Sequence, residues 1–106
     1  MKLTMVRYTV RPDKVEENVK LVRAVYDELS QLRPLGLEYA TFRAPDGVSF
    51  VHLAVVEAGL EPHPLGSLAS FRLFSGTIGE RAQEAPVALE LDEVGSYRFF
   101  AAEGAP

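Results

Sequence analysis

The sequence contains no cysteine, no tryptophan and a single asparagine, Asn18. Without cysteine the chain forms no disulfide, has no thiol nucleophile and cannot ligate an iron–sulfur cluster. The two histidines, His52 and His63, lie in different segments, whereas a zinc site normally needs three or four converging ligands. We therefore expect neither a metal site nor a bound cofactor.

Long apolar runs and an excess of positive charge are also missing. No segment approaches the roughly 20 apolar residues of a membrane-spanning helix, and the first residues alternate like a strand instead of forming a signal peptide. The formal charge is −4 at pH 7, whereas nucleic-acid-binding domains usually present a basic face. We expect a cytoplasmic protein that binds neither nucleic acid nor a membrane.

The composition that remains is typical of a globular domain. The chain has 106 residues, of which 47% are hydrophobic and 25% are charged. A chain of this size buries well over half of the surface that it exposes when unfolded. Repeats, low-complexity tracts and linkers are missing, and we predict one domain over residues 1–106.

Hydrophobic periodicity defines the first two predicted elements. Residues 3–10 alternate with period two, which indicates a strand covered on both sides. From residue 12 to 33 apolar side chains recur every three or four positions, and this predicts a helix. Asp13 followed by Glu16 predicts a side-chain cap at the start of that helix, and Pro34 ends it.

A hairpin is predicted next. Two alternating runs, residues 37–43 and 48–56, flank the dipeptide Asp46-Gly47, which favours a tight turn between two strands. With a two-residue turn, Thr41 falls directly opposite His52.

The last part of the chain predicts a second helix and a fourth strand. The helix spans residues 67–81, and the strand runs from residue 87 toward Phe100 with a kink at Gly95. The order strand–helix–strand–strand–helix–strand is that of the ferredoxin-like α+β fold, βαββαβ. Right-handed crossovers place both helices on one face of a four-stranded antiparallel sheet.

The two faces of this sheet are assigned from apolar content. The most apolar sets are predicted to face the helices: Val6, Tyr8, Val10, Val51, Leu53 and Val55, with Ala40 and Phe42. The open face then carries Leu3, Met5, Arg7, Thr9, Val48, Phe50, His52, Ala54 and Val56, with Tyr39 and Thr41. Soluble monomers rarely expose an apolar patch of this size, so we expect a second copy to cover it. The aromatic residues Tyr97, Phe99 and Phe100 either reach across to that copy or pack in the core.

Candidate catalytic residues are taken from the open face. An imidazole with a pKa near 6.5 accepts a proton from an acidic phenol or carbon, and His52 is assigned this role. Arg7 would hold the resulting anion and Tyr39 would orient it by a hydrogen bond. The expected substrate-binding residues are Met5, Thr41 and Phe50.

A structural alternative exists for each polar residue. His52 would then be an interior histidine bonded to Thr41 or to the partner chain, and Arg7 would pair with an acid across the dimer. His63, between two prolines, is expected to be an exposed loop residue.

Several segments resemble a known group of proteins. These are VRPDKVEE (10–17), FVHLAVVE (50–57), FRLF…GERAQEAPV (71–87) and LDEVGSYRFF (91–100). They are similar to the dimeric α+β barrel superfamily, in particular its antibiotic biosynthesis monooxygenase-like members, over residues 1 to about 100. The resemblance implies a homodimer whose sheets face each other around a space for a small hydrophobic or aromatic ligand.

The activity that the resemblance implies is cofactor-free oxygenation of an aromatic or quinol-type molecule. The alternative is a non-catalytic small-molecule-binding or structural dimer, and an amino-acid-binding regulatory domain shares the same topology. The haem-degrading branch of the superfamily has an Asn on the first strand, a Trp on the third and a His on the second helix. Here Asn18 lies on the first helix and Trp is missing, which argues against haem degradation. Several cofactor-free oxygenases also use a Trp that this chain lacks.

Overall fold

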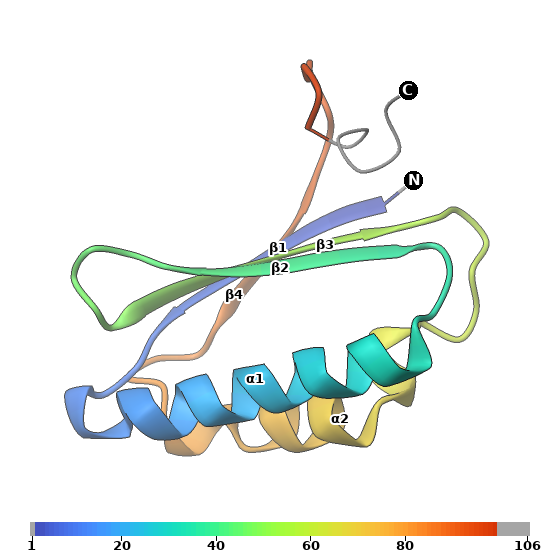
Figure 1. The fold of residues 1–106 in the computed structure, drawn as a ribbon. Coiled ribbons are helices and arrows are strands. Elements are labelled where there is room, and N and C mark those ends of the chain that lie inside the picture. Colours follow the sequence, from blue (N-terminus) through green and yellow to red (C-terminus); the bar gives the residue numbers. More distant parts are fainter. Residues whose placement is uncertain (1, 100–106) are drawn as a thin grey trace.

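The computed structural model describes residues 2–99 (Figure 1). Its strands are β1 (Lys2–Thr9), β2 (Leu37–Arg43), β3 (Ser49–Val56) and β4 (Val87–Leu91). They form an antiparallel sheet in the order β2-β3-β1-β4. The helices α1 (Val15–Leu32) and α2 (Ala69–Gly76) cover one face of this sheet (Figure 1). The predicted ferredoxin-like α+β fold is confirmed. No helix in this described range is long and apolar enough to cross a membrane.

The first helix begins with a 3₁₀ turn, η1 (Pro12–Lys14), and its apolar stripe faces the sheet. Val22 and Val25 on this stripe are buried. The side-chain cap predicted from Asp13 is wrong, because no side chain caps the start of η1 or of α1. At the other end Arg33 adopts a left-handed conformation with φ 48°, and its N–H donates to Leu29 O at 2.8 Å. This is a common way for a helix to end.

The hairpin has the predicted register but a different turn. Thr41 lies opposite His52, as expected. The turn closes where the Gly47 N–H donates to Ala44 O at 2.9 Å, and Gly47 has φ 81°. Asp46 is therefore inside the turn with ordinary negative φ, and its carboxylate accepts the N–H of Val48 at 2.9 Å. Glycine is suited to this place because it adopts positive φ without steric cost.

The second helix and the last strand are shorter than predicted. α2 ends at Gly76, and the flanking residues form separate 3₁₀ turns, η2 (Leu65–Ser67) and η3 (Ile78–Glu80). β4 ends at Leu91, whose partner Leu3 lies next to the first residue of β1. Residues 92–99 leave the sheet (Figure 1). The predicted contribution of Phe100 lies outside the described residues.

The helix-facing side of β3 is the opposite of the one predicted. Val6 and Tyr8 of β1 face the helices as expected, and their direct partners on β3 are His52 and Phe50. Residues directly opposite each other in a sheet share a face. The buried residues of β3 are accordingly Phe50, His52, Ala54 and Val56. The alternating set Val51, Leu53 and Val55, predicted to face the helices, lies on the open face.

The faces of β2 are reversed together with those of β3, because the predicted register between the two strands is confirmed. Tyr39 and Thr41 pair with Ala54 and His52 and so face the helices. Ala40 and Phe42, predicted to face the helices, lie on the open face instead. Phe42 is 55% exposed there. The set Val51, Leu53 and Val55 is the more apolar one, since the other set contains His52, so hydrophobicity favoured the wrong face of β3.

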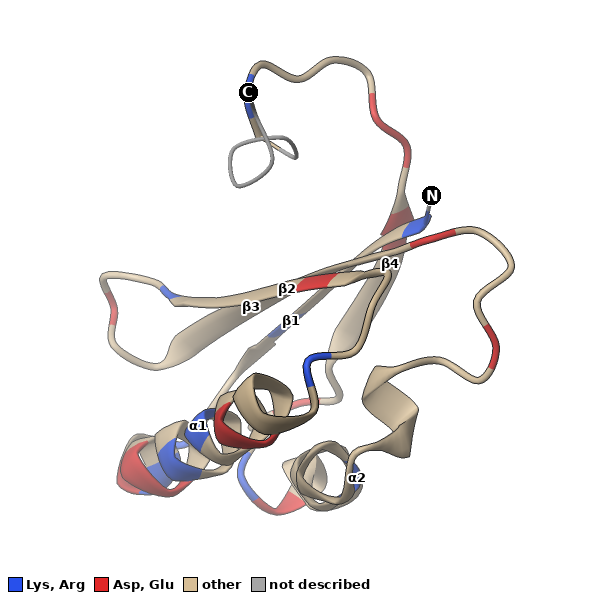
Figure 2. Ribbon diagram, turned by 45° about the vertical axis from the view of Figure 1, so that its right-hand side comes forward, with Lys and Arg blue, Asp and Glu red and all other residues tan. Residues whose placement is uncertain are grey.

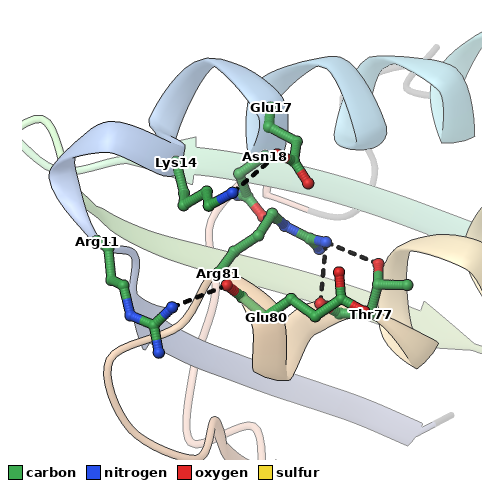
Figure 3. A network of polar contacts seen from close by, with 7 residues as sticks. All are labelled: Arg11, Lys14, Glu17, Asn18, Thr77, Glu80 and Arg81. Carbon is green, nitrogen blue, oxygen red and sulfur yellow. Dashed lines mark hydrogen bonds and ion pairs between the residues drawn. The ribbon is translucent and has the colours of Figure 1, made fainter.

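Arg81 joins the end of α2 to α1 (Figure 3). Its side chain has no exposed surface. The guanidinium donates to the carbonyls of Phe74 at 3.0 Å and Thr77 at 3.1 Å, and Nε donates to Asn18 Oδ1 at 2.8 Å. The carbonyl end of a helix is the negative end of its dipole. Arg81 therefore stabilises the end of α2 and holds it against α1.

We expect Arg81→Met to lower the free energy of unfolding by about 3 kcal/mol, because buried carbonyls and Asn18 Oδ1 lose their donors. Arg81→Lys keeps the charge but lacks the guanidinium fork, so it should restore only part of the loss. Urea unfolding followed by circular dichroism measures both variants. A methionine variant within about 0.5 kcal/mol of wild type, the usual effect of a surface substitution, would show that Arg81 does not have this role.

Candidate ligand-binding site

A cavity of about 440 Å³ lies between α2 and the helix-facing side of the sheet. Its apolar wall is formed by Val6, Ala54, Leu65, Gly66, Phe71, Phe74, Ile78 and Pro86. Its polar residues are Thr4, Tyr8, Tyr39, His52, His63 and Ser75. Cavities of a few hundred Å³ with apolar walls and few polar groups are typical of small-molecule sites. The cavity is therefore suited to a compact aromatic ligand.

His52 is the centre of the polar wall and is 4% exposed. Its Nε2 lies 2.7 Å from the Tyr8 hydroxyl. Its Nδ1 lies 2.7 Å from the Tyr39 hydroxyl and 3.1 Å from Thr41 Oγ1. On one side the ring packs against Phe74, with ring centres 5.2 Å apart. Both ring nitrogens are thus occupied, and the structural alternative of a histidine bonded to Thr41 describes the geometry.

The hydrogen bonds of His52 continue in both directions through the core. Tyr8 Oη accepts from Asn18 Nδ2 at 3.0 Å, and Asn18 Oδ1 accepts from Arg81. On the other side, Thr41 Oγ1 lies 2.7 Å from the Tyr26 hydroxyl. Throughout residues 2–99, every buried polar side-chain atom has a hydrogen-bond partner. The polar wall of the cavity therefore belongs to a buried hydrogen-bond network that runs from Arg81 to Tyr26.

Burial determines the protonation of this network. It lowers the pKa of His52 to about 4, because the charged imidazolium is desolvated. It also raises the pKa of Tyr8 to about 12 and raises the pKa of Tyr39 above its usual range. At neutral pH all three side chains are therefore uncharged. His52 is a weaker base than the sequence suggested.

The predicted catalytic residues do not come together. His52 and Tyr39 are hydrogen-bonded and line the cavity. Arg7 pairs with Val51 and Val87 on the open face. The sheet therefore separates Arg7 from His52, and the prediction that the two residues share a face is wrong. The cause is that the two faces of β3, which carries His52, were predicted the wrong way round. The faces of β1, which carries Arg7, were predicted correctly.

The predicted substrate-binding residues are likewise divided between the two faces. Met5 lies on the open face, opposite Leu53. Thr41 and Phe50 face the helices, but neither lines the cavity. Thr41 instead contacts His52, and Phe50 stacks on Tyr8 with ring centres 5.6 Å apart.

Sequence reasoning missed two groups of site residues. His63, expected to be an exposed loop residue, is exposed and also lines the cavity, and its Nδ1 accepts the Leu65 N–H at 3.1 Å. Asn18 and Arg81 were not singled out as functional. Asn18 could have been found, because it lies among the apolar residues that form the buried stripe of α1, and a polar residue there needs a partner. No comparable signal marks Arg81. Among residues 2–99 no three His, Asp or Glu side chains form a group able to hold a metal ion.

The low pKa of His52 predicts a loss of stability in mild acid. The unfolded chain has a histidine pKa near 6.5 and the folded chain one of about 4, so the unfolded state binds more protons between these values. The contribution of the uncharged His52 to stability is fully present above pH 6.5, and it is lost as the pH falls toward 4. We expect a loss of about 2–3 kcal/mol between pH 7.5 and 4.5 from this residue, measured by urea unfolding.

His52→Gln is the control for this measurement, since it removes the titrating group and keeps His63 and all carboxylates. The difference in stability between wild type and His52→Gln should shrink as the pH falls. A difference that stays constant from pH 7.5 to 4.5 would mean that His52 titrates alike in the folded and unfolded chains.

Comparisons with known proteins identify the fold. No family model matches the sequence, and no curated protein matches it significantly. A proposed antibiotic biosynthesis monooxygenase from Nitrosomonas europaea superposes with a TM-score of 0.75 at 16% identity, covering 90% of this chain and 100% of that one. A second proposed member, from Caulobacter crescentus, has a TM-score of 0.69 at 23% identity and covers 89% and 90% of the two chains.

A third similar structure is that of a mutant of SnoaB, a cofactor-independent oxygenase from Streptomyces nogalater. It has a TM-score of 0.66 at 15% identity and covers 90% of this chain and 95% of its own. Identities this low establish a shared fold and leave the reaction open. The chain therefore has the fold of the antibiotic biosynthesis monooxygenases, as the sequence resemblance implied.

Proposed function

We propose that the protein binds a small aromatic molecule in the cavity and oxygenates it without a cofactor. The observation that carries this proposal is the cavity itself, whose apolar and aromatic wall is interrupted by the hydrogen-bonded pair Tyr39 and His52. The fold adds support, because it is shared with a protein described as a cofactor-independent oxygenase.

The reaction that suits this site begins with an acidic aromatic such as a quinol or an anthrone. Loss of a proton gives an anion whose oxygen carries the charge, and this anion transfers an electron to O₂. The two radicals combine into a peroxide anion, which takes back the proton lost in the first step and becomes a hydroperoxide. The hydroperoxide eliminates water and leaves a carbonyl. For an anthrone, both hydrogens of the reacting carbon leave in that water molecule, so anthrone and O₂ yield anthraquinone and water.

Each polar residue has a separate task in this proposal. The Tyr39 hydroxyl donates to the substrate oxygen and stabilises its negative charge. His52 is a positioning residue that holds Tyr39, because both of its ring nitrogens are engaged and its pKa is low. We assign the removal of the substrate proton to water entering the cavity. Arg7 has no part in this chemistry, since it lies on the other face.

A second candidate function is ligand binding without catalysis. It is favoured by the complete hydrogen bonding of His52, whose low pKa also makes it a poor base. The two functions differ in whether a bound aromatic consumes O₂.

Tyr39→Phe tests the oxygenase proposal. Loss of one preorganised donor at an oxyanion should lower the rate of O₂ uptake with anthrone by about 100-fold. Uptake is followed with an oxygen electrode. Tyr97→Phe is the matched control, because Tyr97 is 81% exposed and lies outside the cavity. Equal uptake by wild type and Tyr39→Phe would contradict the role of Tyr39. Anthrone binding without any uptake by wild type would favour the binding function.

We also propose that two copies of the chain pair through the open face. Phe42, Leu89 and Val87 are exposed there at 55%, 43% and 40%. Charged residues gather on α1 and in the loops, and few lie on the strands (Figure 2). Residues 92–99 extend past the end of the sheet (Figure 1), and Phe99 shares a groove with Leu3, Phe42, Leu53 and Val55. A two-fold related copy would cover this apolar surface with its own equivalent.

Leu53→Glu should convert the dimer to a monomer at micromolar concentration, because it places a charge in the centre of the proposed interface. Light scattering after gel filtration measures the mass. Leu73→Glu is the matched control: Leu73 is 56% exposed but belongs to α2, on the other side of the molecule. A monomeric wild type, or a Leu53→Glu variant that remains dimeric, would rule out this interface.

A further inference from the structure

Asn18 lies in the core, has no exposed surface and does not line the cavity. We propose that Asn18 nevertheless determines what the cavity binds: held by Arg81, it makes the Tyr39 hydroxyl a hydrogen-bond donor and so selects ligands that present an acceptor oxygen. Such a ligand is an aromatic ring carbonyl or a phenolate. This inference rests on the ligand-binding part of the proposed function.

Arg81 and Tyr8 fix the orientation of the Asn18 amide. Arg81 Nε lies 2.8 Å from one end of the amide and Tyr8 Oη lies 3.0 Å from the other. A guanidinium has only donors, so the amide oxygen must face Arg81. The NH₂ group therefore faces Tyr8 and donates to it.

The orientation of this amide sets the tautomer of His52. The Tyr8 oxygen receives a hydrogen from Asn18, so its own proton is directed to the other close atom, His52 Nε2, at 2.7 Å. Nε2 must then present a lone pair. A neutral imidazole carries one proton, and in His52 that proton is on Nδ1. Burial keeps this ring neutral, because it lowers the pKa of His52 to about 4.

The tautomer of His52 determines where the hydroxyl proton of Tyr39 points. With its proton on Nδ1, His52 donates to the Tyr39 oxygen at 2.7 Å, the shorter of its two Nδ1 contacts. A protonated Nδ1 cannot accept, so the proton of Tyr39 turns away from His52. It is directed to Thr41 or to an acceptor on a ligand in the cavity that Tyr39 lines. A ligand acceptor in the cavity therefore competes with Thr41 for a proton that His52 cannot accept.

The same geometry predicts that Asn18→Asp reverses the three hydrogen bonds that connect residue 18 through Tyr8 and His52 to Tyr39, while Arg81 still donates to residue 18. A carboxylate has acceptors only, so Tyr8 must donate to it. His52 must then donate from Nε2 to Tyr8, and its Nδ1 becomes the acceptor of the Tyr39 proton. The shape of the site is preserved, but the cavity now offers an acceptor where the wild type offers a donor.

The tautomer of His52 is measured by NMR on protein with ¹⁵N-labelled histidine, at pH 8 where the imidazole is neutral. We expect the Nδ1–H tautomer in wild type and the Nε2–H tautomer in Asn18→Asp. His63 is an internal reference, because its Nδ1 accepts a backbone N–H and it is therefore expected to remain Nε2–H in both proteins. An Nε2–H tautomer of His52 in wild type would overturn the inference even if Asn18→Asp failed to fold. An unchanged tautomer in a folded Asn18→Asp protein would also overturn it.

The selectivity is measured by calorimetry with two probes of similar shape, 1,4-naphthoquinone, which has carbonyl acceptors, and naphthalene, which has none. The chain has no cysteine to react with the quinone. Wild type should bind the quinone about 5- to 10-fold more tightly than naphthalene, as one neutral hydrogen bond provides, and Asn18→Asp should lose this preference. An equal preference in both proteins, or no binding of either probe, would overturn the selectivity. The tautomer measurement needs no ligand, so it stands apart from the proposed function.

Discussion

The rest of the site depends on one buried cation, Arg81. A guanidinium that is shielded from water must donate its hydrogens to protein acceptors, and it finds them at the carbonyl end of α2 and at Asn18. That requirement orients Asn18, and through Tyr8 and His52 it reaches Tyr39 at the wall of the cavity. A charge needed to close the fold thus also sets the polarity of the ligand site. Stability and binding preference have a common origin here, because the same hydrogen bonds hold the core together and orient the Tyr39 hydroxyl.

Much of the fold was predictable because its elements have a clear period. The strand and helix order, the hairpin register and the pairing of Thr41 with His52 all followed from alternation and turn chemistry. The buried face of β3 was predicted wrongly, since Val51, Leu53 and Val55 are more apolar than His52 and Ala54 between them, yet the set with His52 is the buried one. On the buried side α1 provides polar partners, since Asn18 donates to Tyr8 and the Tyr26 hydroxyl lies 2.7 Å from Thr41 Oγ1. The end of β4 was not predictable from the period either, because apolar residues recur beyond Leu91, where the pairing with β1 stops.

The candidate site was partly predictable for the same reason. His52 and Tyr39 were expected together, and they remain together because a correct register moves both strands to the other face as a pair. Arg7 was separated from them, since β1 had been assigned correctly and did not move. Asn18 left a signal as a polar residue within an apolar helical stripe. Arg81 left none, because its burial depends on where α2 ends.

We propose that the space between α2 and the sheet is the ligand site and that Tyr39 provides its polar contact. A crystal structure of the protein with 1,4-naphthoquinone tests this directly. We expect the ring to pack against Phe71 and Phe74, with a carbonyl oxygen about 2.7–3.0 Å from Tyr39 Oη, the ordinary range for an O–H···O hydrogen bond. A quinone bound on the open face beside Arg7, or one in the cavity with no contact to Tyr39, would contradict the account.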